Sequence, residues 1–73
     1  MSDPVDKPLH YNEGNIECID AIKASMTAEA FAGYLKGNMM KYSWRMAYNN
    51  KPLEDLRKAQ FYLERWVAEV ERG

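Results

Sequence analysis

The sequence predicts an all-α fold: a three-helix domain made of a short helix and a long antiparallel helical hairpin, preceded by an extended N-terminal arm. From residue 16 onward, apolar residues recur at spacings of three and four, as on one face of a helix. The segment YNNKP interrupts that pattern, and no stretch alternates apolar and polar residues as a strand does. A chain of 73 residues holds one domain that buries only about 60–65 % of its unfolded surface, so we expect a homo-oligomer.

The predicted arm comprises residues 1–14, MSDPVDKPLHYNEG, in which two prolines and a glycine disfavour regular structure. It lacks the basic and apolar regions of a signal peptide, and no part of the chain has about 18 consecutive apolar residues. We therefore expect a cytoplasmic protein with no membrane partner. Residues 15–73 are expected to form the single helical domain.

Three helices account for that domain. The isoleucines between residues 16 and 25 predict a short first helix. Thr27 is suited to cap a second helix over about 28–48, because its hydroxyl can accept a hydrogen bond from the first turn. Two asparagines then tolerate left-handed backbone, and Pro52 suits the first turn of a third helix over about 52–71.

Apolar residues on one face of the second and third helices predict the core of the hairpin, which the first helix covers. On the second helix these residues are Ala28, Phe31, Ala32, Leu35, Met39, Ser43 and Met46. On the third helix they are Leu53, Leu56, Ala59, Leu63, Trp66, Val67 and Val70.

A second arc of the second helix, hereafter the glycine–tryptophan arc, holds Gly33, Gly37, Met40, Trp44 and Ala47. Glycines four residues apart let another backbone approach closely, and exposed Met and Trp are typical of protein interfaces. The arc is therefore a candidate oligomer interface. The alternative is that the first helix or the arm covers it.

A third arc of the same helix gathers Tyr34, Asn38, Lys41, Tyr42 and Arg45. A lysine and an arginine four residues apart can bind one anion together, the lysine as a compact charge and the arginine as a planar fork that matches phosphate oxygens. The amide can bind a base edge or a ribose, and a tyrosine can stack on a base. The arc is therefore a candidate phosphate or nucleotide site, although its spacing alone favours a solvated face.

The third helix adds Asp55, Lys58 and Tyr62 beside its core face, where Asp55 can pair with Lys41 or Arg45. The alternative is a solvated face of ion pairs, which is common on helices. His10 is likewise either a structural hydrogen-bonding residue or a catalytic residue.

Composition excludes several classes of function. The formal net charge of −1 gives no global field for polyanions, so non-specific nucleic-acid binding is not expected. Cys18 has no second cysteine to pair with, and with one histidine it cannot build the usual zinc site. Glu17 and Asp20 are too few to predict a metal centre, and neither a phosphate-binding P-loop nor a dinucleotide-binding glycine motif is present. We expect no cofactor, with Mg²⁺ required only if the protein is an enzyme.

Three ordered blocks resemble a family of small phage and prophage proteins of largely unknown function. They are KPLHYNEGNIECIDAI, GYLKGNMMKYSWR and LEDLRKAQFYLER, and together they cover about residues 7–66. The sequence departs from the family pattern at MAYNNK, where a turn rich in glycine and lysine is usual, and at Arg57, where lysine is usual. The family includes a region of the nucleotide kinase of T7-like coliphages.

The resemblance implies nucleotide chemistry in the cytoplasm of a phage host. With it, the candidate ligand-binding residues are His10, Tyr11, Asn38, Lys41, Tyr42, Arg45, Asp55 and Tyr62. The leading hypothesis is a homo-oligomeric protein that sequesters a nucleotide or cyclic-nucleotide signal of antiphage defence, with pockets at or near subunit junctions.

Two alternatives remain. In the first, the protein is a nucleoside monophosphate kinase or nucleotide hydrolase, and Asp55, Glu17 or Asp20 holds magnesium. In the second, the glycine–tryptophan arc inhibits a host protein by direct contact.

Overall fold

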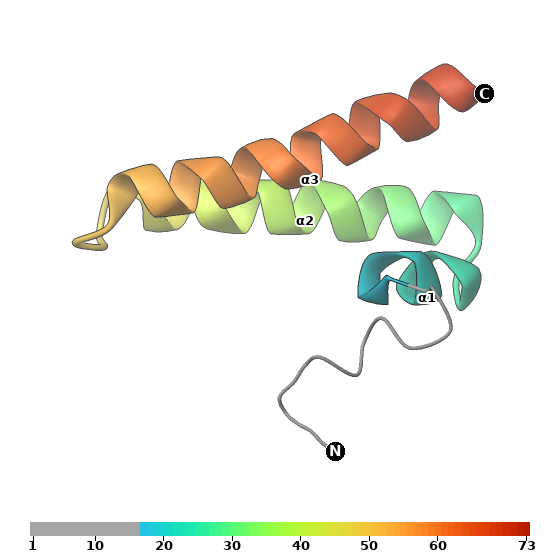
Figure 1. Ribbon diagram of the computed structural model, residues 1–73, viewed down its shortest axis with the longest axis horizontal. Helices are drawn as coiled ribbons and strands as arrows, with labels where there is room; N and C mark the ends of the chain where they lie inside the picture. Colours follow the sequence, from blue (N-terminus) through green and yellow to red (C-terminus); the bar gives the residue numbers. More distant parts are fainter. Residues whose placement is uncertain (1–16) are drawn as a thin grey trace, which may run out of the picture.

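The computed structural model describes residues 17–73, which form three helices and contain no strand. Helix α1 spans Cys18–Ala24, α2 spans Ala28–Arg45 and α3 spans Pro52–Arg72. Helices α2 and α3 run antiparallel side by side, and α1 packs against them near the end of the hairpin that holds the C-terminus (Figure 1). The predicted all-α fold is confirmed. The predicted arm, residues 1–14, lies outside the described residues.

The start of α2 follows the prediction. The Thr27 hydroxyl oxygen accepts a hydrogen bond of 3.1 Å from the Ala30 amide, which satisfies one of the free donors of the first turn. The preceding helix ends at Ala24, where the Ser25 hydroxyl donates to the Ile22 carbonyl at 2.7 Å. These local bonds fix the tight connection between α1 and α2.

The end of α2 comes three residues earlier than predicted. Beyond Arg45, the amides of Ala47 and Tyr48 donate to carbonyls three residues back, at 3.3 and 2.9 Å, so the chain tightens into turns before leaving the helix. The Asn49 side-chain amide then donates to the Asp55 carboxylate at 2.8 Å. This hydrogen bond ties the connecting turn to the first turn of α3, in which Pro52 occupies an initial position as predicted.

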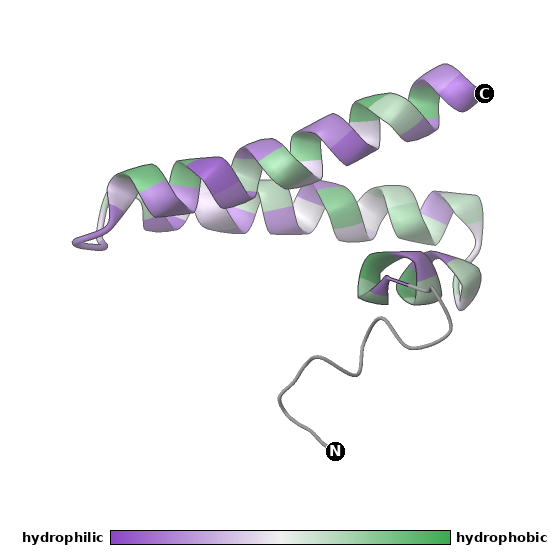
Figure 2. Cartoon of the chain, viewed as in Figure 1, coloured by the Kyte–Doolittle hydropathy of each residue, from purple (hydrophilic) through white to green (hydrophobic). Residues whose placement is uncertain are grey.

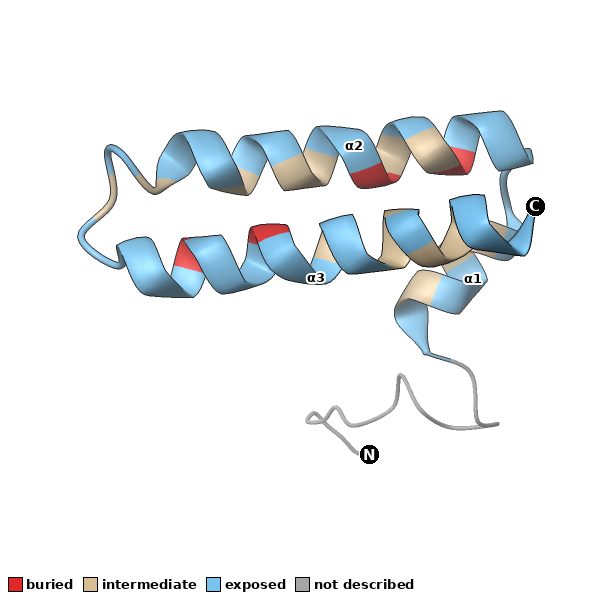
Figure 3. Cartoon of the chain, turned by 90° about the horizontal axis from the view of Figure 1, so that it is seen from above, coloured by how far each residue is buried: buried red, intermediate tan, exposed pale blue. Residues whose placement is uncertain are grey.

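The core is a narrow strip between the two long helices, and its buried residues lie on their facing edges (Figure 3). Phe31 and Leu35 of α2 are 2 % and 0 % exposed, and Ala59 of α3 is 6 % exposed. The predicted core of α2 is confirmed at Phe31 and Leu35, and Ala32, Met39 and Met46 are half-buried. The prediction was wrong for Ala28 and Ser43, which are exposed.

The predicted core of α3 was wrong at most positions. Ala59 is buried and Trp66 half-buried, but the remaining five apolar residues are exposed: Leu53, Leu56, Leu63, Val67 and Val70. The helix instead turns Asp55, Ala59 and Tyr62 toward α2. With roughly 100° between successive residues, the side of α3 that faces α2 lies about a quarter turn around the helix axis from the middle of the predicted apolar face. One neighbouring helix covers only part of so wide an apolar face.

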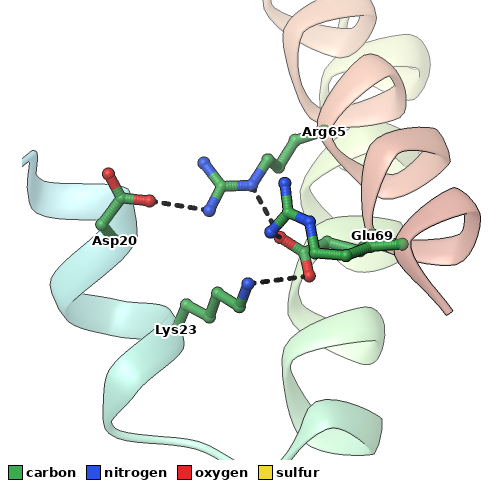
Figure 4. Close-up of polar contacts among 5 residues, drawn as sticks. Asp20, Lys23, Arg65 and Glu69 are labelled. Carbon is green, nitrogen blue, oxygen red and sulfur yellow. Dashed lines mark hydrogen bonds and ion pairs between the residues drawn. The ribbon is translucent and has the colours of Figure 1, made fainter.

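Ion pairs attach α1 to the far end of α3 (Figure 4). Arg65 donates to Asp20 at 2.7 Å and to Glu69 at 3.0 Å, and Lys23 lies 3.0 Å from the other oxygen of Glu69. Lys23 and then Arg65 lower the pKa of the Glu69 carboxyl below its usual value, because both favour the ionised form. The Arg65 guanidinium also lies 5.6 Å from the ring centre of Phe31, so the network touches the core.

Candidate functional site

A pair of stacked tyrosines joins the two long helices. Tyr42 of α2 stacks on Tyr62 of α3 with ring centres 6.0 Å apart and planes 5° apart. Tyr34, two turns earlier on α2, meets the Tyr62 ring edge-on at 6.1 Å. Offset-stacked and edge-on contacts are the favourable arrangements of aromatic rings, so these residues set the rotation of α3 against α2.

Three cations surround the Tyr42 ring. The Lys41 ammonium lies 4.6 Å from the ring centre, that of Lys58 lies 5.4 Å away, and the Arg45 guanidinium carbon lies 5.5 Å away. These distances are within the range of cation–π attraction, which holds the charges together despite their mutual repulsion. Ion pairs between described residues use Lys23, Arg65 and Arg72 instead. We call Lys41, Tyr42, Arg45, Lys58 and Tyr62 the tyrosine–cation cluster.

A surface hollow of about 370 Å³ opens beside this cluster. Its lining residues are Tyr42, Glu54, Arg57, Lys58, Phe61 and Tyr62. The volume falls at the lower end of the range of small-molecule sites. The walls combine aromatic rings, two cations and one carboxylate, and Phe61 is 52 % exposed at the rim.

The Tyr62 phenol is the titratable group most affected by the packing of the cluster. Burial raises its pKa above the usual value of 10.0, and the neighbouring Tyr34 hydroxyl raises it further. The phenol therefore stays neutral at physiological pH and keeps a proton that it can donate in a hydrogen bond.

Most of the chain matches a known protein family. Residues 5–64 match the family described as a protein of unknown function, DUF3310. The chain belongs to the DUF3310 family. The resemblance drawn from the three sequence blocks is thereby confirmed, and the matched segment contains the whole tyrosine–cation cluster.

Two phage relatives contain a similar segment within longer chains. The Gene 1.7 protein of Enterobacteria phage T3 is 44 % identical over 64 residues, which is 82 % of this chain and 39 % of the relative. The protein named Nucleotide kinase gp1.7 of Escherichia phage T7 is 46 % identical over 67 residues, 82 % of this chain and 33 % of the relative. This DUF3310 chain thus spans well under half the length of both. No solved structure matches it.

The fold brings four of the predicted ligand-binding residues of this DUF3310 protein together: Lys41, Tyr42, Arg45 and Tyr62. Asn38 lies one turn away, and its amide nitrogen donates to the Tyr34 carbonyl at 2.9 Å. His10 and Tyr11 lie outside the described residues.

Asp55 has a different environment from the one predicted. It is 1 % exposed, accepts the hydrogen bond from Asn49, and forms no ion pair with Lys41 or Arg45. Its contacts stabilise the turn between α2 and α3.

Three lining residues of the hollow were not predicted from the sequence: Glu54, Arg57 and Phe61. Their spacing of three and four residues is the available signal, because it places them on one side of α3 beside Lys58. That side can be recognised as the binding side only once the rotation of α3 against α2 is known, and the stacking of the tyrosines determines that rotation.

The glycine–tryptophan arc is open to solvent on the described part of the chain. Met40 is 52 % and Trp44 70 % exposed, and a Cβ atom added at Gly33 or Gly37 would meet nothing within 4 Å. A hollow of about 260 Å³ lies at its end, lined by Ser43, Trp44, Ala47 and Tyr48. Helix α1 does not cover this arc, and its role as an oligomer interface stays a prediction.

Two further features concern metals and membranes. Within residues 17–73 no three His, Cys, Asp or Glu side chains gather as potential metal ligands, and Asp20 instead pairs with Arg65. None of the helices in the described part of the chain is both long and apolar enough to cross a membrane.

Proposed function

We propose that this DUF3310 protein binds a nucleotide at the tyrosine–cation cluster. The observation that carries the proposal is the convergence of Lys41, Arg45 and Lys58 on one stacked tyrosine beside a hollow of about 370 Å³. Membership of a family that includes a relative named a nucleotide kinase supports the same ligand class.

The cluster and the hollow beside it together offer both parts of a nucleotide site. Its cations can bind phosphate oxygens through charge-assisted hydrogen bonds, with Arg45 or Arg57 able to bind two oxygens at once. The exposed ring of Phe61 at the rim can stack on a base, a contact worth about 1–3 kcal/mol per base. The cation–π contacts hold Lys41 and Lys58 near the anion in advance, which reduces the entropy lost on binding.

The biological role we propose is sequestration of a nucleotide or cyclic-nucleotide signal of the host. Stoichiometric binding requires an anion site and a surface for a base, which the cluster and the adjoining hollow supply together. A small phage protein with such a site would lower the free concentration of the signal without chemical conversion. The proposed location is the cytoplasm of the host.

Thermal denaturation against a panel of mononucleotides, dinucleotides and cyclic nucleotides tests the proposal. A ligand present at one hundred times its dissociation constant adds about 2.7 kcal/mol to the free energy of unfolding. The shift is expected to disappear in Lys41→Ala and Lys58→Ala and to persist in Lys36→Ala, a matched control because Lys36 is exposed on α2 outside the cluster. A shift in all three variants would refute this site, and no shift with any ligand would refute the function.

A second candidate is a nucleoside monophosphate kinase, favoured by the name of the phage T7 relative. Phosphoryl transfer requires a second nucleotide and usually Mg²⁺. Mass spectrometry of the panel after incubation with ATP and Mg²⁺ separates the candidates: intact ligand supports sequestration, and conversion to a diphosphate supports the kinase.

A further inference from the structure

An apolar stripe runs the length of α3 and is largely uncovered. Its residues are Leu53, Leu56, Gln60, Leu63, Val67 and Val70. The five apolar members are between 43 % and 68 % exposed, and hydrophobic bands recur along α3 from its start to near its end (Figure 2). The alternating spacing of three and four is the heptad pattern by which helices pair. We call this set the α3 stripe.

The described elements of the same chain leave the α3 stripe open. Helix α2 packs against the neighbouring face, through Ala59 and Tyr62. Helix α1 binds Arg65 and Glu69, which project from the side of α3 away from the stripe. Since Phe31, Leu35 and Ala59 are the buried apolar residues in the described chain, one copy has little core to stabilise it.

We propose that a second copy of this chain covers the α3 stripe, with the two α3 helices packed antiparallel. The stripe extends about 26 Å at 1.5 Å per residue. Its first half carries leucines at 53 and 56 and its second half valines at 67 and 70. An antiparallel pair sets Leu53 and Leu56 against the smaller Val70 and Val67, and Leu63 against Gln60. A parallel pair would set each residue against its own copy, large against large and small against small.

Charges beside the stripe select the same orientation. Arg57, Glu64 and Glu71 follow one flank at heptad spacing. The other flank holds the uncharged residues Ala59, which is buried, and Trp66, which is half-buried. In an antiparallel pair the charged flanks of the two copies meet, so Arg57 of each copy faces a glutamate of the other. In a parallel pair each charged flank would meet the uncharged flank of the other copy.

A hollow at the end of the stripe suits the same partner. It has a volume of about 360 Å³ and is lined by Trp66, Val67, Val70 and Glu71. The antiparallel pairing brings Leu53 of the second copy, 62 % exposed in one chain, to this hollow. The leucine side chain can then pack as a knob among the residues that line it.

Sedimentation equilibrium of the full chain tests the proposal. The wild type is expected to have twice the chain mass of 8.5 kDa. Val67→Glu should raise the dissociation constant at least tenfold, whereas Met40→Glu should leave it unchanged; the control is matched because Val67 is 48 % and Met40 52 % exposed. Circular dichroism establishes that each variant remains helical. A monomeric wild type, or dissociation by Met40→Glu and not by Val67→Glu, would overturn the proposal.

Cysteine cross-linking tests the orientation in a Cys18→Ser background, which removes the exposed native thiol. A mixture of Leu53→Cys and Val70→Cys chains should form a disulfide between the two variants, and neither variant should cross-link to itself. Self-linked Leu53→Cys dimers would show a parallel pair. That result, or the absence of any cross-link, would overturn the antiparallel assignment.

Discussion

Replacing Asp55 distinguishes a structural carboxylate from a ligand-binding one. Asp55 is 1 % exposed and accepts a hydrogen bond of 2.8 Å from the Asn49 amide. Hydrogen bonds to charged groups contribute about 1.5–3 kcal/mol. Asp55→Ala should therefore lower the free energy of unfolding by about that amount, and in a domain of this size each kcal/mol lowers the melting temperature by about 4–8 °C.

Glu54→Ala is the matched control for this substitution. Glu54 is an exposed acidic residue in the same turn of α3, so both variants lose the favourable interaction with the helix dipole, about 0.3–1 kcal/mol. Only Asp55→Ala also loses the hydrogen bond to Asn49. The excess destabilisation of Asp55→Ala over Glu54→Ala measures that bond.

A double-mutant cycle with Asn49→Ala completes the assay, read by urea denaturation monitored by circular dichroism. The two residues should couple by at least about 0.5 kcal/mol, the lower end expected for side chains in contact. Equal destabilisation by Asp55→Ala and Glu54→Ala, or additive effects of Asn49→Ala and Asp55→Ala, would refute the structural role assigned to Asp55.

Three further predictions concern other parts of the molecule. The pKa of Glu69 is lowered, so its ion pairs stabilise the fold above the usual carboxyl pKa of about 4.5, and this stability is lost as the pH falls below 4.5 through the folded pKa. In Glu69→Gln, the melting temperature should therefore fall less steeply with decreasing pH than in the wild type. An unchanged acid dependence would contradict the ion-pair network of Glu69. The pKa of Tyr62 is raised, so the folded state favours the neutral phenol, and the free energy of unfolding should fall as the pH rises above 10. In Tyr62→Phe, which has no phenol to ionise, this fall should be less steep than in the wild type. Trp44→Ala should change the free energy of unfolding by less than about 0.5 kcal/mol because the side chain is 70 % exposed, and a fall in sedimentation mass would instead establish the glycine–tryptophan arc as an interface.

The helices themselves were predictable from short-range signals. The Thr27 cap and the initial Pro52 act within one turn, so their effects could be predicted from neighbouring residues alone. The end of α2 was not predictable in the same way, because the amides of Ala47 and Tyr48 keep helix-like hydrogen bonds of shorter span, to carbonyls three residues back. The amino acids from Met46 to Tyr48 are compatible with a helix, although α2 ends at Arg45.

The rotation of α3 was the main feature that periodicity did not predict. Apolar residues mark a face too wide for one neighbour to cover, so their periodicity does not fix which side of α3 meets α2. The stacking of Tyr42 on Tyr62 and the bond from Asn49 to Asp55 select the side that faces α2. Both contacts join residues from different elements, so no spacing within one helix predicts them. The same limit explains why Arg57 and Phe61 were missed in the hollow.

One rotation of α3 thus has two consequences on different sides of the helix. It brings Tyr62 to Tyr42 and completes the cluster, and it turns Leu63 and Val67 outward. A dimer built on the α3 stripe would leave the cluster accessible and bind one ligand per chain, rather than at a shared junction.

Arg57 is where the two surfaces meet, because it lines the hollow and also flanks the α3 stripe. If a phosphate drew Arg57 away from a glutamate of the second copy, ligand binding would weaken the dimer, and by reciprocity dimer formation would weaken ligand binding. The other cations, Lys41, Arg45 and Lys58, project from the opposite side of α3 or from α2 and are free of this competition. Because three of the four cations are unaffected by dimer formation, we expect the dimer-disrupting variant Val67→Glu to bind the ligand with an affinity within about fivefold of wild type. A change of that size is smaller than typical allosteric coupling. Titration calorimetry that found a larger gain in affinity for Val67→Glu would show that Arg57 couples the two surfaces.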